Sequence, residues 1–197
     1  MGAIFQSLSR TVIAGFVLLA VIVGVVTVVS GSNISLSHAW TMFVMRWLHV
    51  MFGVMWIGLL WYFNFVQIPS MPKIPDEQKP AISKVIAPTA LMWFRHAALW
   101  TVITGVLLAG MSGYIGKALM LQKPFLAIGI GMWLALVMAF NVWFIIWPNQ
   151  KKALGIVVVP PEEKAAAARL AMLTSRANTM LSIPMLFCMV AQQNGGL

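Results

Sequence analysis

The stretch RWLHVMFGVMWIGLLWYFNFVQIP, residues 46–69, decides the fold class. It is long and apolar enough for a membrane-spanning helix, which needs about 20 mostly apolar residues. Its only basic side chains are Arg46 and His49. Basic residues inside a membrane span are costly and usually mark function. The stretch therefore predicts a membrane helix and a site on that helix.

Four further apolar runs predict that the whole chain is one transmembrane domain. The 197 residues are 61% hydrophobic and 9% charged, against about 25% charged residues in soluble domains. We expect an all-α bundle of five spans near 11–30, 40–67, 91–113, 125–147 and 168–191. The first span is longer than the apolar part of a signal peptide, about 7–15 residues, so we expect it to be retained. Pro69 and Pro148 are expected to end the second and fourth helices.

The basic residues predict the orientation of the bundle, because Lys and Arg accumulate in cytoplasmic loops. Two of them, Lys117 and Lys123, fall in the segments on one side of the predicted membrane. The other side is much richer and holds Arg10, Lys73, Lys79, Lys84, Arg95, Lys151, Lys152, Lys164 and Arg169. We therefore expect a bacterial-type cytoplasmic membrane, with the N-terminus inside and the C-terminus outside. The net charge of +9 forms no patch or repeat, so no nucleic-acid partner is expected.

Arg46 and His49 lie three residues apart and therefore share one helix face. Gly53 and Trp56 follow on that face, and the glycine leaves a flat slot beside the imidazole. A porphyrin fits such a slot, with its iron on His49 and a propionate on Arg46. In the alternative, Arg46 extends to the membrane interface and His49 makes one hydrogen bond to a neighbouring helix.

Arg176 is a second candidate for a cofactor carboxylate, within the last span. Ser175, Asn178 and Ser182 form a polar strip around it, which also suits helix packing or a proton path. His96 is expected to lie about 15–20 Å from His49 in depth, too far to share an iron. The methionines conceivable as a second iron ligand are Met45, Met132, Met138 and Met180.

Other chemistries lack their signatures. The single cysteine, Cys188, allows neither an internal disulfide nor a CxxC site. Asp76, Glu77, Glu162 and Glu163 are the only acids and lie in predicted cytoplasmic loops, so no carboxylate pair is available inside the membrane. No Gly-rich phosphate loop, nucleophile elbow or HExxH motif is present.

The opening stretch resembles the N-terminal membrane domain of PuuD-type urate oxidases, whose pattern R-W-x-H-x-x-x-G-x-x-W-I-G it follows. Three further stretches are similar to that family: LMWFRHAALWTVITG at 91–105, NVWFIIWPNQKK at 141–152 and SRANTMLSIPMLFCM at 175–189. More distantly, His49, Trp56 and Gly58 resemble a pattern of membrane protoporphyrinogen oxidases and copper-resistance D proteins. Two departures are that some family members have a histidine where this chain has Ala177, and that the C-x-x-C-H haem motif of full-length members is lacking.

The resemblance implies a helical membrane domain with a b-type haem on His49. We expect a redox-associated subunit that transfers electrons in a larger membrane complex, in contact with lipid and other membrane subunits. One alternative is a cofactor-free accessory subunit of a respiratory or oxidase complex. The other is a copper-handling membrane protein, disfavoured because the sequence has no local cluster of Met and His. Urate oxidation by this chain alone is not expected.

Overall fold

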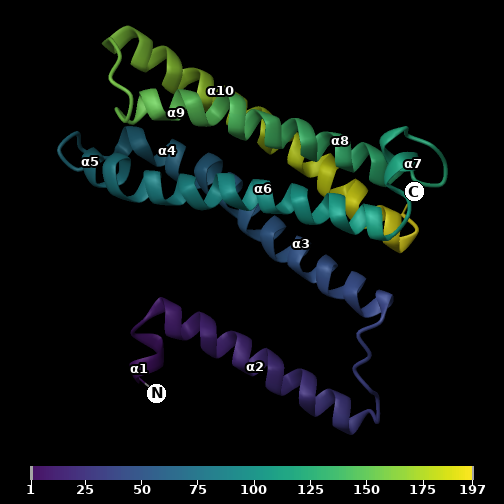
Figure 1. The fold of residues 1–197 in the computed structure, drawn as a ribbon. Coiled ribbons are helices and arrows are strands. Elements are labelled where there is room, and N and C mark those ends of the chain that lie inside the picture. The colour runs from purple at the N-terminus through teal and green to yellow at the C-terminus, as the bar shows by residue number, and fades with distance from the viewer. Residues whose placement is uncertain (1, 197) are drawn as a thin grey trace. The chain divides into compact units, whose positions relative to one another are not determined.

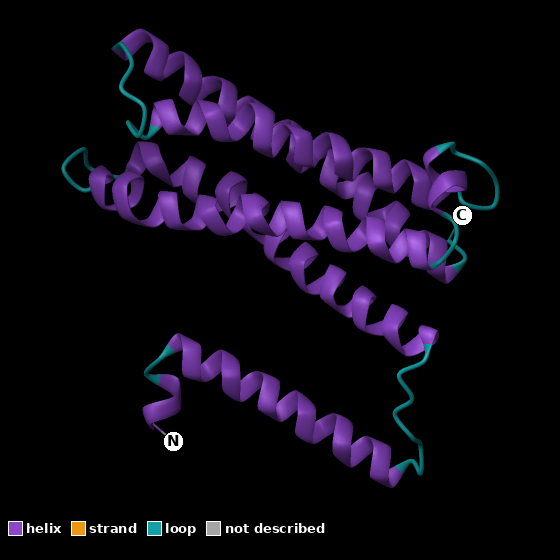
Figure 2. Ribbon diagram, in the orientation of Figure 1, coloured by secondary structure: helices purple, strands orange, loops and turns teal. Residues whose placement is uncertain are grey.

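The computed structural model describes residues 2–196, which are mostly helical (Figure 1). These residues contain no strand, so the predicted all-α class is confirmed (Figure 2). The chain divides into two compact units, Met1–Thr41 and Met42–Leu197, and each is described by itself.

The first unit contains a short helix, α1 (Gly2–Phe5), and a long one, α2 (Leu8–Val29). The 22 residues of α2 extend about 33 Å, which is enough to cross the hydrocarbon layer of a bilayer. None of its side chains is buried. The span predicted at 11–30 therefore corresponds to a helix of suitable length and apolarity.

The second unit is built on four long helical rods, His38–Lys73, Lys79–Met111, Leu126–Ala153 and Pro161–Asn194. The first turn of the first rod belongs to the first unit. The segments of the rods are α3 (His38–Trp61), η1 (Tyr62–Gln67), α4 (Ile68–Ser70), η2 (Met71–Lys73), α5 (Lys79–Ala81), η3 (Ile82–Ile86), α6 (Ala87–Met111), α8 (Leu126–Phe140), η4 (Asn141–Ile146), α9 (Trp147–Ala153) and α10 (Pro161–Asn194). A short helix, α7 (Ile115–Leu119), lies between the second and third rods.

Pro69 and Pro148 do not end their helices, so that part of the prediction was wrong. A π-helical segment precedes each of them: η1 ends two residues before Pro69, and η4 ends two residues before Pro148. Proline clashes with the carbonyl four residues earlier. That carbonyl belongs to Phe65 in η1 and to Phe144 in η4, where the wider π-helical turn accommodates it. The helices continue as α4 and α9.

Within residues 2–196, four helices are long and apolar enough to cross a membrane, and they coincide with the first four predicted spans. The fifth predicted span, 168–191, lies in α10, which is helical but is not among the four. Its polar residues explain this difference, because Arg176, Asn178 and their polar neighbours interrupt its apolar run. The orientation of the bundle stays a prediction.

The core of the second unit combines large apolar side chains with a few buried hydrogen bonds. Trp56, Leu60 and Met138 are fully buried there. Asn178 is also fully buried; its Nδ2 donates to Met138 O at 2.9 Å, and its Oδ1 accepts from Asn141 Nδ2 at 2.8 Å. These bonds join α10 to α8 and η4, so this part of the polar strip of α10 holds helices together.

Candidate functional site

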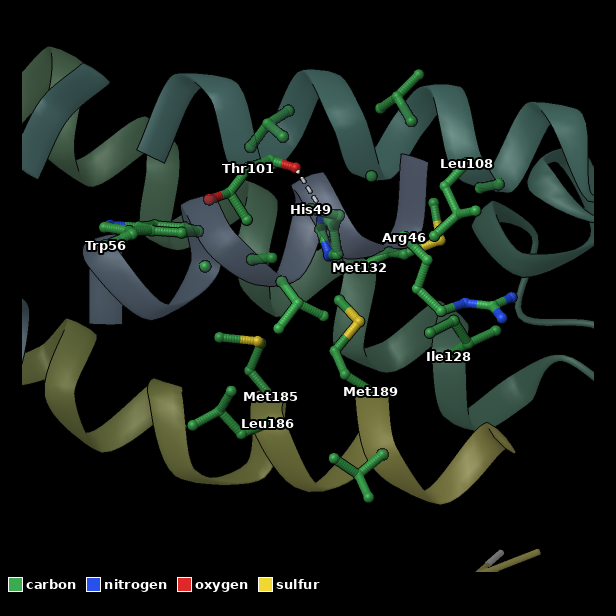
Figure 3. Close-up of a pocket in the computed structure, with 18 of the residues that line it drawn as sticks. Arg46, His49, Trp56, Thr101, Leu108, Ile128, Met132, Met185, Leu186 and Met189 are labelled. Atoms are coloured by element: carbon green, nitrogen blue, oxygen red, sulfur yellow. Dashed lines mark hydrogen bonds between the residues drawn. The ribbon is translucent and has the colours of Figure 1, made fainter. Parts of the chain in front are cut away.

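A cavity of about 700 Å³ lies among α3, α6, α8 and α10 (Figure 3). Arg46, His49, Gly53 and Trp56 line it from α3. Side chains from the other three helices and from α7 with the residue before it complete its wall, and most of them are apolar; examples are Val102, Leu108, Ile128, Met132, Ala135, Met185 and Leu186. The helix face predicted from the spacing of Arg46, His49, Gly53 and Trp56 therefore borders this cavity.

The His49 ring is fixed by α6. Its Nδ1 lies 2.9 Å from the backbone oxygen of Thr101 and 3.2 Å from Thr104 Oγ1. The carbonyl can only accept a hydrogen bond, and the Thr104 hydroxyl is close enough to Trp100 O, at 2.6 Å, to donate to it. Nδ1 therefore carries the proton, and the lone pair of the neutral ring is on Nε2. Figure 3 shows that nitrogen on the cavity side of the ring.

Gly105 makes room for this ring. A Cβ atom at position 105 would lie 2.9 Å from His49 Cε1, closer than real Cβ atoms approach a neighbour, and 3.2 Å from His49 Nδ1, which is also a tight contact. The glycine predicted to form the slot, Gly53, lies instead opposite Thr101, where a Cβ would be 4.0 Å from Cγ2. The close glycine of this site is thus on α6, in the sequence TVITG.

Arg46 lies at the open end of the cavity. Its side chain is exposed, and Tyr114, from the segment after α6, lines the same end. Burial raises the pKa of the Tyr114 phenol, whereas the positive charge of Arg46 acts in the opposite direction. The cavity therefore has a polar, cationic entrance.

Trp56 forms the inner wall and is fully buried. Figure 3 places its indole and the Arg46 guanidinium at opposite ends of the cavity, with the His49 ring between them. The Trp56 Nε1 has no hydrogen-bond partner among residues 2–196. The site thus runs from a charged entrance to an aromatic end wall.

The structure does not bring Arg176 to the cavity. Its side chain is exposed, while its neighbours Ser175, Asn178 and Ser182 are buried. Ser175 accepts a hydrogen bond of 2.8 Å from Asn64 Nδ2, and Ser182 accepts one of 3.0 Å from Trp61 Nε1. The polar strip thus faces the helices, and the arginine points away from them.

His96 is separate from this site. Its Nδ1 lies 2.8 Å from the carbonyl oxygen of Met92 in the same helix, and its ring contacts Trp143 edge-on. Thr101 and Gly105, which contact His49, follow His96 by about 8–14 Å along α6. This depth difference is smaller than the 15–20 Å expected, but the two rings have different neighbours.

Three methionines line the cavity with His49: Met132 from α8, and Met185 and Met189 from α10 (Figure 3). Met132 was among the methionines considered as an iron ligand, whereas Met138 is fully buried in the core and Met180 is largely exposed. Sequence reasoning missed Met185 and Met189. Their spacing of four residues places them on one helix face, but it does not identify the neighbour of that face.

No group of three or more His, Cys, Asp or Glu side chains that could hold a metal occurs among residues 2–196. A metal in the cavity would therefore depend on His49 together with thioether sulfur or an organic cofactor. Thioether sulfur is a soft, uncharged ligand, which suits an apolar cavity.

Residues 122–195 match the family model described as urate oxidase N-terminal. The match covers less than half of the chain and includes α8, η4, α9 and α10. It confirms the resemblance of the stretches at 141–152 and 175–189, while those at 46–69 and 91–105 lie outside it. No curated protein and no solved structure matches the chain. The matched residues, 122–195, include α8 and α10, which form two walls of the cavity.

Proposed function

We propose that the chain is a multi-pass protein of a bacterial cytoplasmic membrane that holds one b-type haem on His49 and transfers electrons in a larger complex. The observation that carries this proposal is the state of the His49 ring. Its Nδ1 bonds to the Thr101 carbonyl, and its Nε2 is left to the cavity. Histidines that bind metals usually have this arrangement, because the second hydrogen bond fixes the tautomer and the ring orientation.

The residues present fit a haem group. A volume of about 700 Å³ is within the range of about 300–1,000 Å³ usual for cofactor sites. The lining is mostly apolar, as a porphyrin requires, and Arg46 at the entrance provides a cation for a propionate. A bound haem would supply one-electron transfer through its iron.

Each residue of the site has a definite task in this proposal. His49 is the iron ligand, and Thr101 and Thr104 hold its ring. Gly53 and Trp56 border the porphyrin, and the wall on the α8 and α10 side excludes water. The thioether of Met132, Met185 or Met189 is available as a second ligand.

A copper(I) site is the second candidate, and the three methionines favour it. Thioether sulfur and imidazole are ligands that suit copper(I). These ligands form no local cluster along the sequence, but His49, Met132, Met185 and Met189 all line one cavity. In this candidate the protein binds copper in the membrane, and Arg46 has no ligand role.

The test is an absorption spectrum and a metal analysis of protein purified in mild detergent. A Soret band that is lost in His49→Ala and retained in His96→Ala supports the haem proposal. Stoichiometric copper without a Soret band, lost in His49→Ala and in Met185→Leu, supports the copper candidate. If neither haem nor copper is present and neither binds when added, both are overturned and the cofactor-free accessory subunit is the remaining interpretation.

A further inference from the structure

A second cluster of functional groups lies away from the cavity, where α6 meets α9. The Arg95 guanidinium carbon is 3.8 Å from the centre of the Trp147 ring, and Lys151 Nζ is 5.7 Å from the same centre. Both are cation–π distances. Since both charges lie over one indole, they are at most about 10 Å apart and repel each other.

In the part of the chain that the structure describes, neither cation has a carboxylate partner. The two ion pairs recorded among residues 2–196 are Lys79 with Asp76 and Lys152 with Glu163. Neither Arg95 nor Lys151 takes part in them, although both side chains are partly buried. The adjacent lysines 151 and 152 thus differ, since Lys152 has an acidic partner and Lys151 has an aromatic ring.

Exposed apolar side chains lie on the same helical rods as the two cations. Phe140 and Phe144 stack on each other at 4.8 Å and are 55% and 67% exposed. On α6, Met92 and Leu99 share a face with Arg95 by their spacing and are each 38% exposed. The His96 ring contacts Trp143 edge-on and so links α6 to η4.

We propose that this surface binds one anionic phospholipid, with its phosphate between Arg95 and Lys151 and its acyl chains along the exposed side chains of α6, α8 and η4. Charge complementarity favours an anionic head group, because two neighbouring cations without a carboxylate partner attract a phosphate. The exposed apolar side chains on the same rods favour a lipid over a free phosphate ion. Trp147 and the lysines after it mark the membrane interface, where such head groups lie.

This inference does not rest on the haem proposal, because none of Arg95, Trp147 and Lys151 lines the cavity. The segment FRHAALW of α6, residues 94–100, does not line the cavity, and in this proposal its Arg95 binds the lipid head group. It also predicts that the lipid contacts the same end of the bundle that the positive-inside rule places in the cytoplasm.

The experiment uses native mass spectrometry of the full chain with phosphatidylglycerol or phosphatidylcholine of identical acyl chains. One tightly retained phosphatidylglycerol and no comparable phosphatidylcholine is the expected result for the unchanged protein. Arg95→Gln and Lys151→Gln should each weaken phosphatidylglycerol about fivefold, the effect of one interfacial charge. Lys152→Gln is the matched control and should leave binding unchanged. Circular dichroism shows that each variant is folded, and Arg95→Lys, which keeps the charge, should restore much of the binding.

Three outcomes would overturn the proposal. Equal retention of the two lipids would show that the head group is not recognised. Equal weakening in Lys151→Gln and Lys152→Gln would show that the basic end attracts anions without a site. Displacement of the lipid by millimolar inorganic phosphate would show that the site takes the free anion.

Discussion

Nδ1 of His49 lies 2.9 Å from the backbone oxygen of Thr101, a residue 52 positions later in the chain. This contact joins α3 to α6 and determines which ring nitrogen is available to a ligand. The backbone carbonyl of residue 101 is present whichever side chain that residue carries. The backbone of α6 therefore determines that the proton of His49 is on Nδ1. The residues that matter most for the ring are therefore those that permit the close approach of the two helices.

Gly105→Ala should displace the His49 ring, because the new methyl group would lie 2.9 Å from Cε1. We expect the loss of any ligand bound through His49, measured from the Soret band or from the metal content. Gly110→Ala is the control in the same helix, since nothing lies within 4 Å of a Cβ there. That control should stabilise the protein by up to about 1 kcal/mol, the difference between alanine and glycine in a helix. Equal effects of the two changes would contradict the role of Gly105.

Thr104→Val removes the second hydrogen-bond acceptor of Nδ1 and keeps the shape of the side chain. The Thr101 carbonyl remains, so we expect a partial effect, about a 10-fold loss of haem or metal affinity. Thr104→Ser should restore the affinity. Nitrogen-15 NMR of labelled histidine is an independent measurement, and it should show the Nδ1–H form of neutral His49 in the unchanged protein. Observation of the Nε2–H form would refute the assignment of the ring.

Arg46→Gln should raise the pKa of Tyr114 further. Burial already holds this pKa above the ordinary value, and the charge of Arg46 opposes the rise. Removing a positive charge favours the neutral phenol, so the pKa must move upward. Tyrosinate absorbance measured in a Tyr62→Phe background follows Tyr114 alone, because the chain has two tyrosines. A downward movement would show that Arg46 does not act on the entrance of the cavity.

Asn178→Leu should destabilise the bundle, because it leaves Met138 O and Asn141 Nδ2 without their partner. Hydrogen bonds between helices in membranes are modest, so we expect about 1–2 kcal/mol in the free energy of unfolding. Arg176→Gln, two residues away on the exposed side of α10, should change that free energy by no more than about 0.5 kcal/mol. Unfolding in mixed micelles with increasing detergent denaturant gives both values. A larger loss of stability in Arg176→Gln than in Asn178→Leu would mean that α10 packs on the other helices through the face that carries Arg176.

Cysteine labelling tests the orientation predicted from the lysines. With Cys188 replaced by alanine, a cysteine at position 77 should be protected in intact cells from a reagent that cannot cross the membrane. A cysteine at position 122, between α7 and α8, should react with the same reagent. The opposite pattern would invert the bundle.

The all-helical class, the helices long and apolar enough to cross a membrane, and one face of the cavity could be predicted from the sequence, because each depends on residues within one helix. Arg46, His49, Gly53 and Trp56 follow the helical period, and all four line the cavity. Gly105, Met185 and Met189 could not be found in this way. Their contribution depends on the register between helices, which the period of a single helix does not contain.

The side of α10 on which Arg176 lies could not be predicted from the sequence either. Its polar neighbours suggested one polar face, but Ser175, Asn178 and Ser182 are buried and Arg176 is exposed. The polar character of a residue in this helix does not tell whether its side chain faces the other helices or points away from them.

The π-helical segments before Pro69, Pro88 and Pro148 share one register, since each ends two residues before its proline. A π-helical turn contains about one residue more than an α-helical turn, and one residue rotates a helix by about 100°. Each such segment is therefore equivalent to a single-residue insertion that changes the angular phase of everything after it. If one of these prolines were replaced, deleting the extra residue of the π-helical turn before it would keep the two parts of the rod in the same angular phase. A deletion elsewhere in the same rod would rotate the buried side chains after it toward the outside.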